Sequence, residues 1–91
     1  MNDTTTAGNS VESTYFETET ERVIKFVRGD TVAVVALNNA GYGMLKVRSA
    51  LDGEELERYY GLDMALDHAG DLLDHPPNDL PVPDEATDMG M

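Results

Sequence analysis

The chain has 91 residues, of which 18 are acidic and six are basic, so its formal net charge is −12. It contains no cysteine, which excludes disulfides and thiolate metal sites. Its N-terminus has neither the basic nor the apolar region of a signal peptide, and no apolar run approaches the roughly 20 residues of a membrane helix. We therefore expect a cytoplasmic protein with no membrane partner.

The charges are unevenly distributed along the chain. Residues 1–21 carry a charge of −5 with no base, and residues 59–91 carry −8 with no base. All six cations lie in residues 22–58, whose net charge is +1. Aspartate outnumbers glutamate ten to eight, and only two of the cations are lysine. This composition is typical of a protein adapted to concentrated salt, where the screening length falls to about 3 Å and self-repulsion is reduced.

Composition also divides the chain into three parts. Residues 1–13 are mostly Asn, Thr, Ser, Gly and acids, which predicts a disordered arm. Residues 76–91 combine prolines with acids and have no periodicity, which predicts a proline-rich, acidic, disordered tail. Residues 14–75 remain as a single domain. A domain of about 60 residues buries only about 60% of its unfolded surface, so its core is small.

The first predicted strands are Tyr15–Thr20 and Arg22–Arg28, which are rich in β-branched and aromatic residues. Gly29-Asp30 fits a type II′ hairpin turn that leads into a strand at Thr31–Leu37. Pairing across this turn places Phe26 opposite Ala33 and Ile24 opposite Val35.

Two further strands follow a loop at residues 38–41. They are Tyr42–Ser49 and Glu55–Tyr60, joined by the hairpin signal Asp52-Gly53. Pairing across that turn places Leu45 opposite Tyr60 and Val47 opposite Arg58. The two hairpins together predict one core face, formed by Ile24, Phe26, Val35, Leu37, Leu45, Val47, Leu56 and Tyr60.

Leu62–Asp74 is predicted to be a helix, because leucines and alanines recur at helical spacing along it. This apolar stripe would cover the core face of the sheet. The sequence thus predicts an α+β fold: an antiparallel sheet of four or five strands, covered on one face by a single C-terminal helix, with disordered acidic ends.

The opposite face of the predicted sheet is half apolar and otherwise mostly cationic. A solvated face is usually more polar, and the strand Thr31–Leu37 is apolar on both sides, so we expect something to cover this face. A second copy of the chain would do so, with Arg48 and Glu57 as a local ion pair. The alternatives are the N-terminal arm folding across the face, an acidic partner protein or a nucleic acid. The residues of this candidate partner face are Val23, Lys25, Val32, Val34, Met44, Lys46, Arg48 and Tyr59.

The two histidines, His68 and His75, are the first place to look for a metal or a general base. Seven helical residues rise about 10.5 Å, so both imidazoles cannot bind one ion from a continuous helix. Asp71 with His75 could form half a site. No serine, threonine or lysine lies in a pattern that supplies a base and an orienting group. We expect no metal, no cofactor and no catalytic residue.

Residues 22–73, RVIKFVRGDTVAVVALNNAGYGMLKVRSALDGEELERYYGLDMALDHAGDLL, resemble small acidic proteins of haloarchaea without an assigned function. The shared motifs are turn and packing signatures, so the resemblance implies a salt-adapted cytoplasmic setting and no catalytic residue. A more distant similarity, of sheet order and terminal helix alone, is to antitoxins with a partial ribonuclease-H-like sheet. Fold-level analogy of this kind does not establish function.

The sequence favours a non-enzymatic interaction domain that forms a homodimer or binds a protein partner. One alternative is a nucleic-acid-associated or antitoxin-like regulator, in which Tyr59 stacks on bases while Lys25, Lys46 and Arg48 contact phosphates. Another is a small enzyme that uses His68 or His75.

The charge pattern predicts salt-dependent stability. As salt is lowered from molar to millimolar, self-repulsion among 18 carboxylates grows, and the fold should weaken. Circular dichroism across a salt series measures this directly. An unchanged spectrum and unfolding midpoint at every salt concentration would contradict the salt-adapted interpretation.

Overall fold

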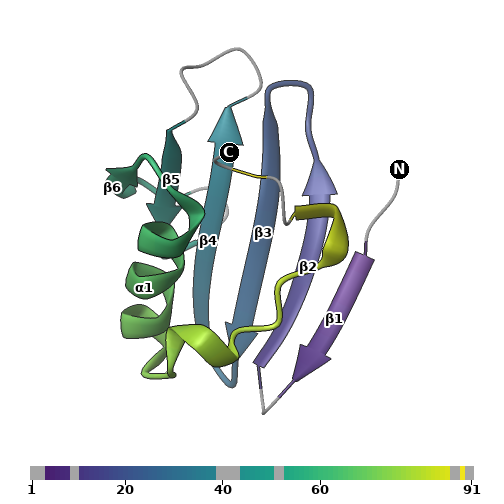
Figure 1. The fold of residues 1–91 in the computed structure, drawn as a ribbon, viewed down its shortest axis with the longest axis vertical. Coiled ribbons are helices and arrows are strands. Elements are labelled where there is room, and N and C mark those ends of the chain that lie inside the picture. The colour runs from purple at the N-terminus through teal and green to yellow at the C-terminus, as the bar shows by residue number, and fades with distance from the viewer. Residues whose placement is uncertain (1–3, 9–10, 39–43, 51–52, 87–88, 90–91) are drawn as a thin grey trace.

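A computed structural model of the chain describes residues 4–8, 11–38, 44–50, 53–86 and 89 (Figure 1). These residues form one antiparallel sheet of six strands in the order β1-β2-β3-β4-β5-β6, followed by one α-helix and two short 3₁₀ turns. The elements are β1 (Thr4–Gly8), β2 (Val11–Glu17), β3 (Glu21–Arg28), β4 (Thr31–Asn38), β5 (Leu45–Arg48), β6 (Glu55–Tyr59), α1 (Leu62–Leu73), η1 (Pro77–Asp79) and η2 (Asp84–Ala86).

The predicted α+β fold is confirmed, with more strands than the four or five expected. Gly29 has a φ of +60°, as the first central residue of a type II′ turn requires, and Phe26 and Ile24 lie opposite Ala33 and Val35 as predicted. Within the described residues, no helix has the length and apolar character needed to cross a bilayer.

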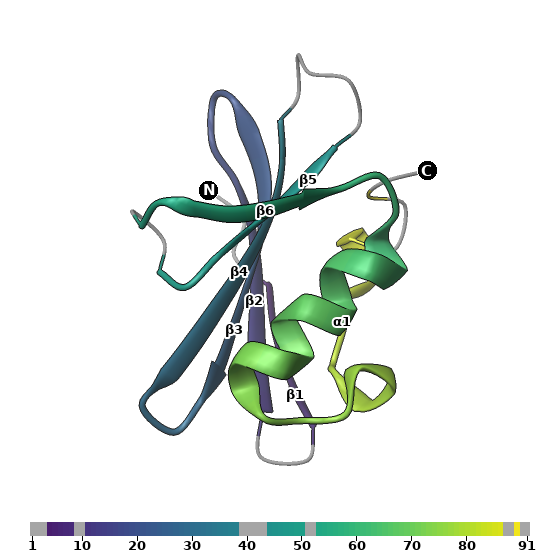
Figure 2. The ribbon, with the colours of Figure 1, turned by 90° about the vertical axis from the view of Figure 1, so that its left-hand side faces the viewer.

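Helix α1 packs on one face of the sheet, over the half that contains β4, β5 and β6 (Figures 1 and 2). Small residues make the contact: Ala65, Ala69 and Gly70 are buried together with Leu73. Gly70 is required where the chain turns back, because a Cβ there would lie 2.7 Å from the carbonyl oxygen of His75.

The end of α1 is held to the sheet by Arg28. One guanidinium nitrogen, Nη1, donates to the carbonyl oxygens of Leu73 and Asp74, both at 2.7 Å. Asp74 adopts the left-handed conformation that closes the helix, with φ 54° and ψ 51°. A cation at a helix C-terminus also meets the negative end of the helix dipole. The last residue of β3 therefore fixes where the helix stops.

Within residues 1–13, for which the sequence predicts a disordered arm, the structure describes residues 4–8 and 11–13 as strand. Thr4–Gly8 pairs with Val11–Tyr15 as an antiparallel hairpin, so β2 begins at Val11 rather than at Tyr15. Val11 and Ser13 are fully buried. A strand of low hydrophobicity can still form here, because pairing with its neighbour supplies hydrogen bonds for its backbone N–H and C=O groups. Only every second side chain has to be buried.

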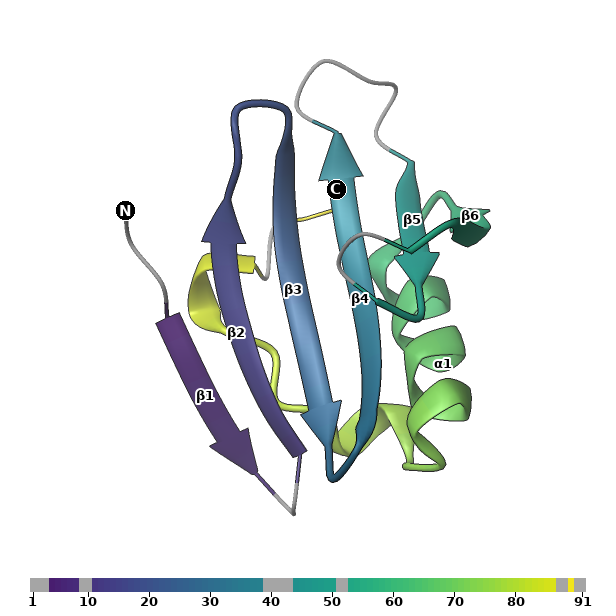
Figure 3. The same cartoon turned by 180° about the vertical axis from the view of Figure 1, so that it is seen from behind.

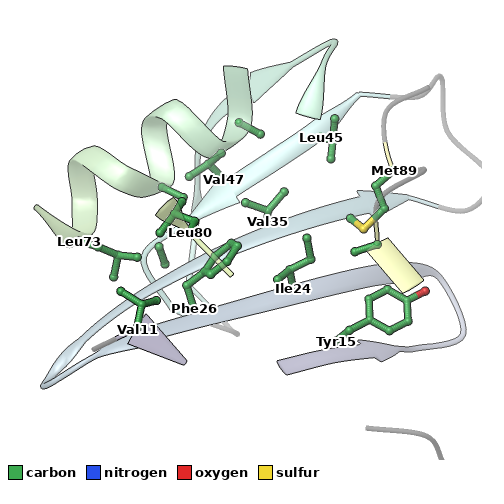
Figure 4. Close-up of a cluster of buried hydrophobic side chains, with 14 residues drawn as sticks. Val11, Tyr15, Ile24, Phe26, Val35, Leu45, Val47, Leu73, Leu80 and Met89 are labelled. Carbon is green, nitrogen blue, oxygen red and sulfur yellow. The ribbon is translucent and has the colours of Figure 1, made fainter. Parts of the chain in front are cut away.

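The structure also describes residues 76–86 and 89, within the segment for which the sequence predicts a disordered tail. Residues 77–86 cross the same face as α1, over the half of the sheet that contains β2 and β3 (Figure 1). Leu80, Pro83, Ala86 and Met89 are buried against that face, and Leu80 and Met89 lie among the core side chains in Figure 4. The prolines exclude a regular helix, yet the buried residues recur at every third position of the segment, a spacing that matches neither a strand nor an α-helix.

Side chains of β2 and β3 hold this C-terminal segment in place. Ser13 Oγ donates to the carbonyl oxygen of Pro81, and Arg22 Nη2 donates to that of Glu85 at 2.6 Å. Arg22 Nε also donates to the Tyr15 hydroxyl at 2.9 Å, and that hydroxyl donates to Glu17 Oε2 at 2.6 Å. Burial and the bond to Glu17 raise the pKa of Tyr15 above its ordinary value.

Truncation of Leu80 tests whether the C-terminal segment is part of the core. Leu80 is 6% exposed, so Leu80→Ala should lower the free energy of unfolding by about 2–5 kcal/mol. The neighbouring exposed Asp79→Ala is the control and should change it by less than about 0.5 kcal/mol. Urea denaturation in molar salt measures both. Equal stabilities for the two variants would mean that the segment does not pack.

Replacement of Tyr15 by phenylalanine tests the network beside the segment. Because the folded-state pKa of Tyr15 is raised, its contribution to stability is complete below pH 10 and is lost as pH rises through the folded value. The unfolding free energy of the wild type should therefore fall more steeply above pH 10 than that of Tyr15→Phe. Denaturation curves at a series of pH values compare the two slopes, and parallel slopes would contradict the raised pKa.

Candidate functional site

Figure 3 shows the sheet face that α1 and the C-terminal segment leave uncovered, here called the open face. Across neighbouring strands, Lys25 lies opposite Val34, which lies opposite Arg48. In the same way, Val23 lies opposite Ala36, which lies opposite Lys46. Val27 lies opposite Val32. The described apolar and cationic side chains thus share one face, as their alternation predicted.

The apolar part of the open face is nevertheless buried within the single chain. Val23 is 2% exposed, Val34 and Ala36 are fully buried, and Phe16 and Val32 pack against them as a second small cluster. Long cationic side chains flank these positions in the sheet, and their aliphatic stems can cover shorter neighbours while the charged ends stay in water. The open face therefore offers a partner much less apolar surface than the sequence indicated.

The cationic part of the open face is partly neutralised by one carboxylate at the start of β3. Glu21 Oε2 lies 2.7 Å from Arg48 Nη2 and 3.6 Å from Lys46 Nζ, and all three side chains are mostly buried. The predicted Arg48–Glu57 pair is corrected, because the sheet register places Glu57 opposite Val47. Sequence reasoning missed Glu21 because it placed this residue before the strand rather than in it.

Tyr59 lies on the face covered by α1, not on the open face. It is opposite Leu45 in the sheet, its hydroxyl is 3.0 Å from Nδ1 of His68, and the two rings meet edge to face at 5.8 Å. The cause is an irregularity beside Val47 that shifts the β5–β6 register by one residue from the predicted one. A one-residue shift moves every side chain of a strand to the other face. Met44, at the entry to β5, is half-buried.

The two histidines do not meet. His68 is engaged with Tyr59, and Nδ1 of His75 lies 3.1 Å from the carbonyl oxygen of Pro76. His75 lines an open hollow of about 370 Å³ with Gly70, Asp71, Asp74, Pro76 and Pro77. In the part of the chain that the structure describes, no group of three or more histidines and carboxylates could hold a metal ion.

Among the residues that the structure describes, the most exposed large apolar side chains lie where the sheet ends and the helix begins. Leu56 is 47% exposed, Tyr60 is 74% exposed and Met64 is 53% exposed, and we call these three residues the edge patch. The prediction that Leu56 and Tyr60 belong to the core is wrong. In the β5–β6 register, Arg48 pairs with Glu55 and Val47 pairs with Glu57. Leu56, between these two glutamates, therefore has no partner residue on β5. The signal in the sequence was the run of charges around Leu56, which is unusual for a buried strand.

Leu56 of the edge patch lies in β6, the last strand of the described sheet, while Tyr60 follows that strand and Met64 lies in α1. β6 pairs with β5 on one side, and the described chain places no strand on its other side. Figure 2 shows β6 crossing in front of the other strands before the chain enters α1. The backbone N–H of Arg58 donates to Glu57 Oε1 at 3.3 Å, so this edge amide takes its acceptor from a side chain.

Carboxylates surround the edge patch. Residues 54–67 contain five acids and a single base, Arg58. Arg58 Nε donates to Glu55 Oε2 at 2.5 Å, and this hydrogen bond lowers the pKa of Glu55 and raises that of Arg58. The base is therefore already paired within the strand. The edge of the sheet presents an apolar patch in a negatively charged setting.

Comparison with known proteins gives one match. The model of a family described as "Family of unknown function (DUF7111)" matches residues 5–91, which include β2 through the buried C-terminal segment. No curated protein and no solved structure matches the chain.

Proposed function

We propose a function for this chain, which belongs to the DUF7111 family of unknown function, from the surface that its fold leaves apolar. The chain acts as a non-enzymatic interaction domain adapted to concentrated salt, and it associates through the edge patch. The observation that carries this proposal is the exposure of Leu56, Tyr60 and Met64 beside the last strand of the sheet.

A single exposed apolar residue would carry little weight, because much of any protein surface is apolar. Here the three large exposed ones fall within nine residues, and one is a tyrosine. Tyrosine is enriched among the residues that contribute most to binding at interfaces, since its ring is large, rigid and amphipathic. A patch of this size suits the small, transient class of interface rather than an obligate one.

The edge patch has more support than the open face, where dimerisation was first expected. Val23, Val34 and Ala36 of the open face are already buried in the monomer, whereas the edge patch is not. Nucleic-acid binding has less support as well. Glu21 contacts both Lys46 and Arg48, and the aromatic residue proposed for stacking, Tyr59, packs against His68 on the other face.

The non-enzymatic part of the proposal is supported by how the two imidazoles are used. His68 is half-buried and bonded to the Tyr59 hydroxyl, which orients its ring as a structural contact. His75 lies in an open hollow at the end of α1 with a backbone carbonyl as its partner. Each imidazole is thus bonded within the chain, and this use of both rings as internal contacts is what supports the non-enzymatic interpretation.

The triple variant Leu56→Ser, Tyr60→Ser and Met64→Ser tests the proposal. These side chains are exposed, so the circular dichroism spectrum should be unchanged. Association, whether with a co-purifying protein or a second copy, should weaken by at least about tenfold, as expected when interface anchors are truncated. Affinity purification and light scattering in molar salt measure it.

The control for this experiment is Lys25→Glu on the open face. It should leave association unchanged if the edge patch is the contact. The same proteins and the same oligomeric state for the wild type and the triple variant would contradict the proposal. Loss of association in Lys25→Glu alone would move the site to the open face.

A further inference from the structure

We propose that β6 is a strand-addition site: an extended segment of another protein, bearing lysine or arginine at alternate positions, pairs with β6 as a seventh strand of the sheet. This inference rests on the interaction function proposed above and names its partner. Main-chain hydrogen bonds to an open sheet edge supply affinity in this mode of recognition, while alternate side chains supply specificity.

The backbone of β6 is the first ground for this proposal. β6 ends the sheet, and the N–H of Arg58 bonds at 3.3 Å to the carboxylate of the preceding residue. Backbone hydrogen bonds to a neighbouring strand are shorter, with a usual separation of about 2.9–3.0 Å. A strand laid along β6 would offer carbonyl oxygens at that distance.

The side chains of β6 are the second ground. Leu56 lies in β6 and Tyr60 directly follows it, one on each side of Arg58 in the sequence. Both are largely exposed, and Met64 follows them in the first turns of α1. These side chains would contact the apolar residues of an added strand as cross-strand neighbours.

Charge determines the kind of partner. Residues 54–67 carry five acids, and their single base is bound to Glu55 at 2.5 Å. A segment with alternating cations would meet these carboxylates, and unlike charges across a strand pair are favourable. The same carboxylates disfavour phosphates, so this surface excludes nucleic acid and anionic membrane surfaces.

A second copy of the chain is disfavoured by the sequence of β6. A twofold antiparallel pair places the central residue opposite itself. Centred on Glu57, the pair sets glutamate against glutamate, and centred on Arg58 it sets arginine against arginine. Like charges directly opposite one another destabilise a strand pair, and charged edges are how sheet proteins avoid joining edge to edge. The occupant is therefore a different, basic chain.

The test uses the full chain and three synthetic ten-residue peptides, at the lowest salt concentration at which circular dichroism shows the fold intact. One peptide alternates lysine with valine. A second replaces lysine by glutamate, and a third replaces alternate valines by proline, which cannot pair on both sides of its backbone. Fluorescence anisotropy of the labelled peptides measures binding, and amide hydrogen exchange of the protein locates it.

The lysine–valine peptide should bind at least tenfold more tightly than either other peptide and should slow exchange at the β6 amides. Arg58→Pro should weaken binding at least tenfold, because it removes an edge donor, whereas Arg58→Ala should not weaken it. If Arg58→Pro does not fold, the exchange pattern of the wild type decides.

Equal binding of the lysine–valine and proline peptides would reduce the interaction to charge attraction and overturn strand addition. Protection outside β6, or protection of β6 in concentrated protein without peptide, would overturn it as well. Any of these results leaves the proposed function standing if the triple variant still loses its partners. Retention of the partners by the triple variant refutes the proposed function independently.

Discussion

The structure depends on covering one face of a sheet that has little apolar material to cover it. Helix α1 is only 12 residues long and packs over β4, β5 and β6. The β2–β3 half of the same face would be left open to water without the C-terminal segment, whose Leu80, Ala86 and Met89 complete the core. The chain has no cysteines, so disulfides cannot compensate for a small core. The C-terminal segment instead adds to the buried apolar surface.

Polar side chains of the sheet determine where both covers sit. Arg28 binds the carbonyl oxygens at the end of α1, while Ser13 and Arg22 bind carbonyl oxygens of the C-terminal segment. Two of these three residues, Arg22 and Arg28, are cations from the nearly neutral middle of the chain, and they bind the backbone of its acidic end. The acids of that end, such as Asp79, Asp84 and Glu85, remain exposed. An acidic sequence can therefore pack without burying its carboxylates.

The irregular pairing of β5 with β6 has the largest consequence for function. It moves Tyr59 under α1, where it meets His68, and it leaves Leu56 outside the register. The apolar surface available for contact is consequently at the edge of the sheet rather than on its open face. Both proposals draw on this local feature, since it leaves Leu56 exposed on β6, which ends the sheet among the described strands.

The sequence by itself determined the α+β fold, the hairpin between β3 and β4, and the helix after Gly61, because periodicity and turn chemistry are local properties. It also placed Val23, Lys25, Val34, Lys46 and Arg48 on one face, since alternation along a strand requires it. The tertiary structure decided the rest: which face Tyr59 occupies, that Glu21 binds both Lys46 and Arg48, and that the two acidic ends pack. These outcomes depend on a register shift and on contacts between residues up to 68 positions apart, as between Ser13 and Pro81, and no local pattern encodes such contacts.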